Sequence, residues 1–230
     1  MSSEGQRGDK VPEAFVERTL FRHPRLYQIK RFLIEDVIWG FLLSRVFRLD
    51  AHPLPDLAAK YAGRQVLVGA CGPGDDITGP PIVGAASVTA FDLSPGFAQV
   101  CARRRPEWSV FCGDLLAIPH ADDAFEVSVL YSSLHHVPAD AEEVLAEIAR
   151  VTRGRIVLLE GLVPERGITR FLLLLWYRLV DGGHHYYTEG ELLERIERLG
   201  LRVESSARYS PIRHMWLADL TPTPGDTLGP

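Results

Sequence analysis

The chain has 230 residues, of which 46% are hydrophobic and 24% are charged, and these values exclude a disordered chain. That length fits one domain, with or without a small appendage. The formal net charge is −5, so no overall positive field attracts nucleic acid, and we expect no nucleic-acid partner. Cys71, Cys101 and Cys112 match no zinc spacing and no paired framework, so we expect no metal and a reducing compartment.

The amino-terminal residues contain no apolar core of the kind that secretory signals have. The most apolar runs, Val37–Leu43 and Phe171–Trp176, are far shorter than the roughly 18–20 residues that a membrane helix requires. We therefore expect a cytoplasmic protein without a transmembrane segment.

Residues 1–63 are predicted to form an amino-terminal helical cap. One apolar stripe recurs there at spacings of three and four, which is the period of a helix: Leu26, Ile29, Phe32, Leu33, Val37 and Phe41. Basic residues lie in or near the same stretch: Arg18, Arg22, Arg25, Lys30 and Arg31. A solvated helix face is the favoured interpretation of these charges. The alternative is a grip on an anionic substrate or a lipid surface, so peripheral lipid contact stays open.

Residues 64–161 alternate between strand-like and helix-like segments. Strands are predicted over 65–68, 88–91, 108–112, 125–130 and 156–159. A helix begins at Ser94-Pro95, with a capping residue and then a proline at its first position. A second helix covers 140–151, and Gly154 is expected to stop it. Repeated alternation of this kind predicts a parallel sheet with right-handed crossovers and helices on both faces.

The pattern changes after residue 161. Residues 168–179 form a very apolar helix, and Thr188-Glu189-Gly190-Glu191 is a capping box that opens a helix ending near Gly200. Strands over 201–208 and 213–220 are joined by a turn at Ser210-Pro211, so the last strand is predicted to run antiparallel to its neighbours. The tail over 221–230 is rich in proline and glycine and is expected to be loose.

The strongest local signal is a strand that runs into a glycine turn, at residues 66–75. Such a turn lets the backbone approach a ligand closely. Asp92 follows Gly72 by 92 − 72 = 20 residues, where a carboxylate can accept hydrogen bonds from a ribose diol. The third glycine of a dinucleotide motif would fall on Ile77, and the lysine of a phosphate loop is missing. These features favour an adenosine cofactor with a small zwitterionic end, such as S-adenosylmethionine.

At these motifs the sequence resembles the class I S-adenosylmethionine-dependent methyltransferases, in particular the small-molecule branch similar to ubiquinone and menaquinone biosynthesis enzymes. Four segments carry the resemblance in the family's order: the turn Cys71-Gly72-Pro73-Gly74, Phe91-Asp92-Leu93-Ser94-Pro95, Gly113-Asp114-Leu115 and Leu134-His135-His136-Val137. His184-His185-Tyr186-Tyr187-Thr188 resembles the approach to the family's late helix. Val68 and Ala70 stand where the family usually has an acid and a glycine, and Pro80-Pro81 falls where its first helix should continue.

The resemblance implies an α/β, Rossmann-like, seven-stranded and mostly parallel sheet with an antiparallel last strand, in a domain spanning 64–220. It implies S-adenosyl-L-methionine as the cofactor and S-adenosyl-L-homocysteine as the product. Asp92 would bind the ribose hydroxyls and Asp114 would face the adenine amine. The implied cofactor-binding residues are Gly69, Ala70, Cys71, Gly72, Pro73, Gly74, Asp92, Leu93, Gly113, Asp114, Leu115, Leu130, Tyr131 and Ser132.

The acceptor is expected to be a small apolar or aromatic molecule that receives the methyl group on an O, N or C atom. His135 and His136 are candidates for the base, with packing in the loop as the favoured alternative. The candidate substrate residues are Tyr27, His184, His185, Tyr186 and Tyr187. Two other functions stay open: a methyltransferase-like protein that serves as a binding partner, and a nicotinamide-dependent reductase. A homodimer also stays open.

Overall fold

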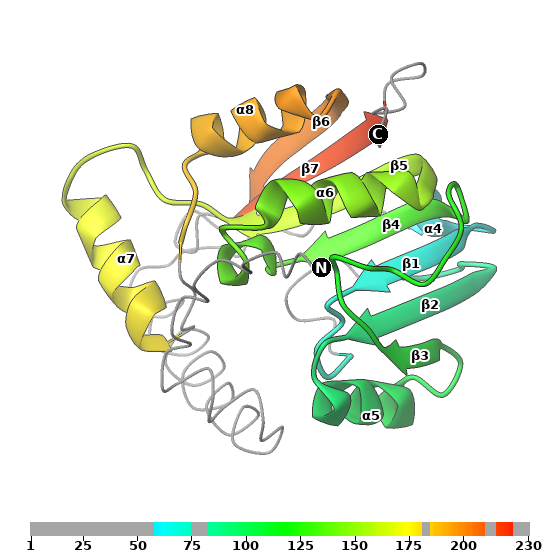
Figure 1. The fold of residues 1–230 in the computed structure, drawn as a ribbon. Helices are drawn as coiled ribbons and strands as arrows, with labels where there is room; N and C mark the ends of the chain where they lie inside the picture. The colour runs from blue at the N-terminus through cyan, green and yellow to red at the C-terminus, as the bar shows by residue number, and fades with distance from the viewer. Residues whose placement is uncertain (1–57, 75–81, 181–184, 210–214, 223–230) are drawn as a thin grey trace, which may run out of the picture.

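A single seven-stranded sheet organises the chain, with the strand order β3-β2-β1-β4-β5-β7-β6 (Figure 1). The structure is a computed structural model, and it describes residues 58–74, 82–180, 185–209 and 215–222. The strands are β1 (Gln65–Gly69), β2 (Ser87–Asp92), β3 (Ser109–Cys112), β4 (Phe125–Tyr131), β5 (Thr152–Gly161), β6 (Leu201–Tyr209) and β7 (Met215–Pro222).

The sheet is mostly parallel, with one antiparallel strand. β1 pairs in parallel with β2 on one side and with β4 on the other. β7 runs antiparallel to both β5 and β6, so the predicted fold class is confirmed. Because the chain moves outward from β1 in one direction to β2 and β3 and then returns to β4, the strand order reverses beside β1. Ligands of open α/β sheets bind beyond the carboxyl ends of the strands at such a reversal.

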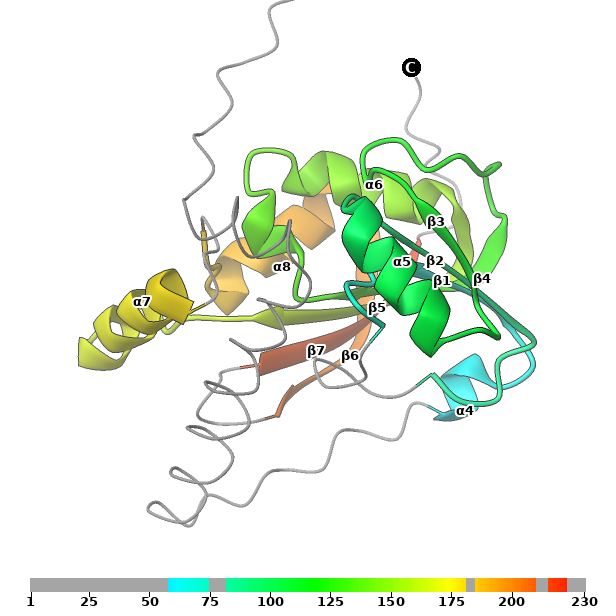
Figure 2. The ribbon, with the colours of Figure 1, turned by 90° about the horizontal axis from the view of Figure 1, so that it is seen from below.

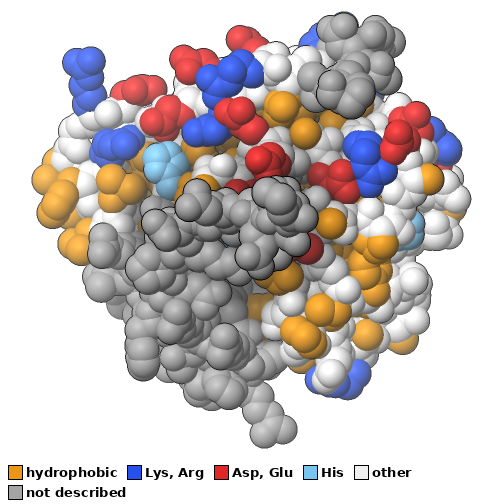
Figure 3. Space-filling model, viewed as in Figure 1, with side chains coloured by type: hydrophobic (Ala, Val, Ile, Leu, Met, Phe, Trp, Pro, Cys, Tyr) orange, Lys and Arg blue, Asp and Glu red, His pale blue; other side chains and the backbone are white. Residues whose placement is uncertain are grey.

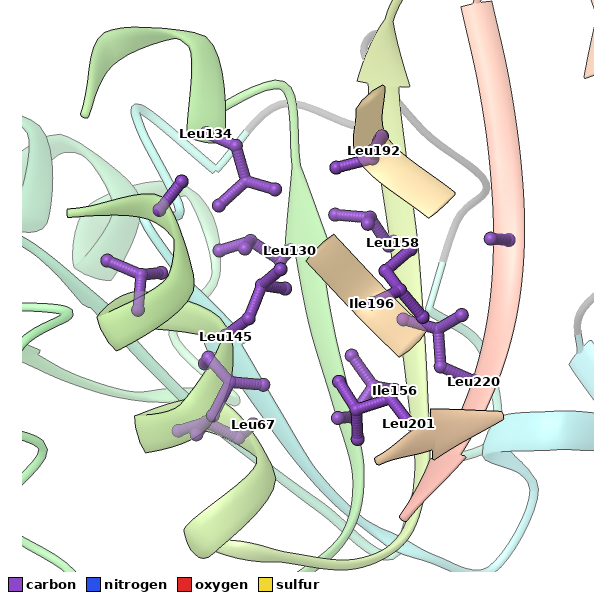
Figure 4. Close-up of a cluster of buried hydrophobic side chains, with 14 of the residues drawn as sticks. Leu67, Leu130, Leu134, Leu145, Ile156, Leu158, Leu192, Ile196, Leu201 and Leu220 are labelled. Carbon is purple, nitrogen blue, oxygen red and sulfur yellow. The ribbon is translucent and has the colours of Figure 1, made fainter. Parts of the chain in front are cut away.

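Residues along each strand alternate between two buried faces, as the pleat requires. Figure 4 shows one face, where Leu67, Leu130, Ile156 and Leu158 of the sheet meet side chains of the covering helices, among them Leu145. The neighbours of these strand residues belong to a second cluster on the opposite face, which consists of Tyr61, Val66, Val68, Val88, Ala90, Val127, Val129, Val157, Leu159 and Leu217. Burial on both faces explains why the central strands read as continuous apolar runs.

The helices are α4 (Ala58–Tyr61), α5 (Pro95–Arg104), α6 (Ala141–Arg150), α7 (Ile168–Val180) and α8 (Glu189–Arg198), with the short 3-10 turn η2 (Leu134–His136) after β4. α6 and α8 cover the face shown in Figure 4. α7 stands apart from the sheet, beyond the carboxyl ends of the parallel strands, in both Figure 1 and Figure 2. No helix among the described residues is long and apolar enough to cross a membrane.

Two predicted helix starts are confirmed. The hydroxyl of Ser94 accepts a hydrogen bond from the backbone N–H of Phe97, and Pro95 is the first residue of α5. Thr188 and Glu191 form both bonds of the capping box at the start of α8. Ser and Thr at these positions satisfy N–H groups that the helix itself leaves without a partner.

The predicted role of Gly154 is wrong. α6 ends at Arg150, and Gly154 lies inside β5, where it does not serve as a helix stop. A Cβ atom at position 154 would lie 2.3 Å from the backbone oxygen of Glu126, which is far inside contact distance. Glycine is required there because β4 and β5 approach each other closely at an irregularity in their register.

Several predictions fall on residues outside the described ranges. These are the amino-terminal cap up to residue 57, the interrupted helix at Pro80-Pro81, the turn at Ser210-Pro211 and the tail from residue 223. The division of the chain into a cap, a domain and a tail therefore stays a prediction.

The capping box gives a test of helix α8. Replacing Thr188 with alanine removes the acceptor for the Glu191 N–H, and we expect the free energy of unfolding to fall by about 1 kcal/mol. Denaturant titration monitored by circular dichroism measures this change. Thr169→Ala on the exposed surface of α7 is the matched control, and an equal loss in both variants would contradict the role of the cap.

Candidate functional site

The turn after β1 contains three residues in the left-handed region of backbone conformation. Ala70, Gly72 and Gly74 all have positive φ angles, of 49°, 54° and 75°. A Cβ atom on Gly74 would lie 2.9 Å from Sγ of Cys101 on α5, so the turn packs directly against that helix. A Cβ atom on Gly72 would meet no atom of the described residues within 4 Å. As far as these residues go, the space beside Gly72 is open to a ligand, and glycine lets that ligand approach the backbone.

The carboxylate of Asp92 joins this turn to the loop after β2. One oxygen, Oδ2, accepts the N–H of Gly72 at 2.8 Å, and the other, Oδ1, accepts the N–H of Ser94 at 2.8 Å. The side chain is buried, with 8% of its residue surface exposed. Because each carboxylate oxygen can accept more than one hydrogen bond, both oxygens keep capacity for a further donor. Asp92 therefore fixes two loops and can still bind a hydroxyl.

Burial raises the pKa of Asp92 above its ordinary value of 3.8. The N–H groups of Ser94 and Gly72 and the charge of His136 act in the opposite direction and do not cancel the effect of burial. His136 is the last residue of η2, and its charge is the smallest of these influences.

The loop after β3 lies beside the loop after β2. The N–H of Gly113 donates to the backbone oxygen of Asp92 at 3.1 Å. A Cβ atom on Gly113 would lie 2.7 Å from the ring of Phe111, so a larger residue would displace that ring. Asp114 is exposed, and its Oδ1 accepts the N–H of Leu116 at 3.0 Å. Leu93 is exposed between these two loops, whereas Leu115 packs against the core.

At the end of β4, the side chain of Leu130 is directed into the core, away from the site, and the backbone of the following residues is what borders the site. Leu130 is fully buried and points into the core, as Figure 4 shows. Ser132 has a positive φ of 48°, and its N–H donates to the backbone oxygen of Leu159 at 2.7 Å. The hydroxyl of Tyr131 lies 2.9 Å from that of Tyr61. Burial raises the pKa of Tyr61 to about 12, so this phenol stays neutral at physiological pH.

Cys71 is held as a neutral thiol. Contact with the thiol of Cys101 and burial both raise the pKa of Cys71 above its ordinary value. A neutral thiol is a poor nucleophile. The geometry therefore supports the interpretation of Cys71 as a packing residue of the turn.

His135 is bound to a fully buried carboxylate that the sequence analysis did not single out. Nδ1 of His135 contacts Oε1 of Glu160, a residue with no exposed surface at the end of β5. The same carboxylate accepts the N–H of Leu134 at 3.0 Å and the N–H of Gly161 at 3.1 Å. These donors offset the cost of burying a charged group. Glu160 therefore fixes both the 3-10 turn and the orientation of the His135 ring.

An aromatic stack continues from His135 toward α7. The ring centroid of His135 lies 4.1 Å from that of His136 and 4.9 Å from that of Tyr186. Tyr186 in turn stacks on Tyr177 of α7 at 4.2 Å, with an angle of 10° between the rings. His135 is almost fully buried in this stack, and His136 is half-buried.

Of the remaining candidate substrate residues, His185 and Tyr187 are described and two others are not. The N–H of His185 donates to the backbone oxygen of His135 at 3.2 Å, which ties the segment before α8 to η2. Tyr187 is fully buried under the guanidinium of Arg195, and burial raises its pKa to about 12. Tyr27 and His184 lie outside the described residues. The structure thus brings Tyr186 to His135, but it places Tyr187 in the core.

Glu160 could have been noticed in the sequence. It ends the run Ile156-Val157-Leu158-Leu159-Glu160, and an acid at the end of a buried strand requires a partner. The sequence shows no partner, because His135 is 25 residues away.

Comparisons with known proteins agree with these observations. Residues 67–158 match a family described as a methyltransferase domain. A demethylmenaquinone methyltransferase of Renibacterium salmoninarum is 33% identical over 114 residues, which are 49% of this chain and 47% of that protein. A second one, of Paenarthrobacter aurescens, is 30% identical over 159 residues, which are 68% of this chain and 54% of that protein. This chain spans about half the length of the curated relatives it matches.

A solved structure shows the same fold over most of the chain. The magnesium protoporphyrin IX methyltransferase of Synechocystis PCC 6803, with bound S-adenosylhomocysteine, has a TM-score of 0.57 and 14% identity. The similarity covers 86% of this chain and 99% of that one. At such low identity the likeness concerns the fold alone.

The raised pKa of Asp92 predicts a pH dependence of stability. Between its ordinary pKa of 3.8 and its higher folded value, the native state binds more protons than the unfolded chain. This group therefore lowers stability as the pH rises through that window. Asp92→Asn removes the effect, so the free energy of unfolding of the variant minus that of the natural protein should increase with pH.

Urea titrations at a series of pH values measure this difference. Glu107→Gln on the exposed surface is the control, because an exposed carboxyl changes stability little with pH. A difference for Asp92→Asn that stays constant or falls with pH would show that burial does not dominate at this carboxylate.

Proposed function

We propose that this chain, whose residues 67–158 match a methyltransferase domain, uses S-adenosylmethionine to methylate a small molecule. The observation that carries the proposal is the Asp92 carboxylate, which holds the glycine turn against the loop after β2. Asp92 ends β2, the neighbour of β1, and the strand order reverses on the other side of β1, the place at which this architecture binds nucleoside ligands.

The residues around the turn fit such a cofactor. The open space beside Gly72 would admit the methionine end, and the remaining lone pairs of Asp92 would accept the ribose hydroxyls. The exposed Asp114, beside Leu93, would face the adenine. When bound, the cofactor supplies a methyl group on a positively charged sulfur. The chain's own task is to align that methyl group with an acceptor, and alignment alone can supply on the order of 7–11 kcal/mol of the barrier.

An apolar or aromatic acceptor is favoured by what surrounds the site. The stack of Tyr186, Tyr177 and His135 makes the region beside η2 aromatic, and aromatic surroundings suit an apolar acceptor. The relatives are named demethylmenaquinone methyltransferases, so a quinone precursor is the first acceptor to test.

A base is required where the accepting atom carries a proton. The bound cofactor would supply the methyl group that replaces this proton, and the proton would pass to the base. His136 is half-buried, and His135 is oriented by Glu160. We assign the proton transfer to this histidine pair, with Glu160 as a positioning residue.

Removing the carboxylate of Asp92 tests cofactor binding. Asp92→Ala should weaken the affinity for S-adenosylhomocysteine by about 1.5–3 kcal/mol, the contribution of charge-assisted hydrogen bonds, measured by isothermal titration calorimetry. Asp122→Ala on the exposed surface is the matched control. Equal affinity of the Asp92 variant and the natural protein would refute the assignment.

Replacing Glu160 tests the histidine pair. Glu160→Gln keeps the size of the side chain but removes its charge, and we expect kcat to fall at least about tenfold, because a base contributes about 10²–10⁴-fold. The affinity for S-adenosylhomocysteine should not change. Steady-state transfer of labelled methyl groups to demethylmenaquinone measures kcat.

Glu126→Gln is the matched control. Glu126 also accepts a backbone N–H, but it lies near the start of β4, whereas η2 and His135 follow the end of that strand. Thermal unfolding of each variant shows whether it is folded. An unchanged kcat in a folded Glu160→Gln variant would remove Glu160 from the mechanism.

A second function is favoured by the turn itself. Ala70 holds a positive φ where a glycine would be unstrained, and Val68 is buried where an acid would meet the cofactor's amino end. A protein of this fold that binds the cofactor without methyl transfer would have these features. Stabilisation by S-adenosylhomocysteine, about 2.7 kcal/mol at 100 times its dissociation constant, without transfer to any acceptor would favour this function.

A further inference from the structure

Helix α7 is apolar on two opposite sides. One side packs on the body of the protein, where Leu173 forms a cluster with Val163 and Tyr186. The other side exposes four large hydrophobic residues at positions i, i+3, i+4 and i+7. They are Ile168, Phe171, Leu172 and Leu175, with 70%, 62%, 54% and 46% of their surface exposed. This spacing places them on one stripe of the helix, which we call the outer face of α7.

The outer face of α7 differs from the other exposed apolar residues of the described part of the chain. Those residues, Val83, Leu93 and Leu116, lie singly on separate loops. Single exposed hydrophobic residues are normal, whereas a contiguous patch marks a contact surface. Figure 3 shows hydrophobic side chains gathered at the left edge, where Figure 1 places α7. α7 lies apart from the sheet, beyond the strand ends (Figures 1 and 2), and the four side chains of its outer face are exposed.

The segment that carries the outer face is mostly basic. Residues 166–180 contain Arg166, Arg170 and Arg178 and no acid, and Glu165 is the acid that directly precedes them. The net charge over 165–180 is therefore 3 − 1 = +2. Arg166 is exposed, and the guanidinium of Arg170 donates to the backbone oxygen of Pro164 at 2.9 Å. An apolar helix face in a basic segment, with an exposed arginine just before the helix, is typical of helices that lie in the interface of anionic bilayers.

We propose that the outer face of α7 binds the surface of an anionic lipid bilayer. A second copy of the chain fits less well, because a two-fold contact brings this segment against its own copy, and both copies carry a net charge of +2 there. The face itself consists of hydrocarbon side chains, which need no directional partner. Large apolar side chains of this kind enter the boundary between headgroups and acyl chains.

The position of α7 connects this surface to the proposed site. Tyr177 on the inner side of α7 stacks on Tyr186, and Tyr186 stacks on His135. The lipid-facing helix is therefore separated from the histidine pair by two aromatic rings. This rests on the proposed function and deepens it, because a helix held at the bilayer surface would bring the site close to an apolar acceptor dissolved in the bilayer.

Vesicle sedimentation tests the proposal with the full chain. The natural protein should bind vesicles of phosphatidylcholine with phosphatidylglycerol more tightly than vesicles of phosphatidylcholine alone. The double variant Phe171→Ser/Leu172→Ser should bind the anionic vesicles at least about tenfold more weakly. Arg166→Glu should weaken binding to anionic vesicles only. Val83→Ser, an exposed residue outside α7, is the matched control and should bind as the natural protein does.

Circular dichroism and calorimetry with S-adenosylhomocysteine confirm that the variants are folded. Absence of vesicle binding by the natural protein, or equal binding by the double variant, would overturn the proposal. A dimer in analytical ultracentrifugation that the double variant abolishes, without vesicle binding, would assign the face to a second copy. Vesicle binding requires neither cofactor nor acceptor, so a protein that binds vesicles but not the cofactor would refute the proposed function and leave this inference standing.

Discussion

The buried carboxylate of Asp92 is the constraint on which the arrangement of the site depends. Its two oxygens accept backbone N–H groups from two different loops, those of Gly72 and Ser94, so one side chain sets the distance between the ends of β1 and β2. The loop after β3 is tied to the same place, because the backbone oxygen of Asp92 accepts the N–H of Gly113. Three strand ends are thus held together by one residue. Burial disfavours the charged form of this carboxylate, whereas its hydrogen bonds favour that form. Further hydrogen bonds from a ligand would stabilise the charged carboxylate more.

A second buried carboxylate organises the other half of the site. Glu160 at the end of β5 holds Leu134, Gly161 and the ring of His135 at once, so η2 has little freedom to move. The stack from His135 through Tyr186 to Tyr177 then connects the sheet to α7. The two halves have different chemistry: the Asp92 side is polar, whereas the Glu160 side adjoins a buried aromatic stack. The proposed function would use this division, because a methyl donor and an apolar acceptor must meet while each is bound by groups of its own kind.

The prediction of the fold succeeded where local chemistry decides. The glycine turn, the Ser94 cap, the capping box at Thr188 and the antiparallel last strand all follow from neighbouring residues and were confirmed. The prediction for Gly154 was wrong because a glycine after a helix usually ends that helix. Here glycine is required because the backbone of Glu126, on a different strand, lies too close for a side chain. Glu160 was missed for the same reason, since its partner His135 lies on another segment of the chain.

The sequence by itself determined the class of sheet, the order of its elements, the glycine turn and the acid 20 residues after it, because strand and helix periods, caps and turn residues act over short distances. Only the tertiary structure decided what each of these groups touches. Asp92 is shown as a bridge between two loops, Glu160 as the partner of His135, Tyr187 as a core residue and α7 as a helix with an apolar outer face. Burial and pairing depend on segments far apart in the chain, and no local pattern of residues records them.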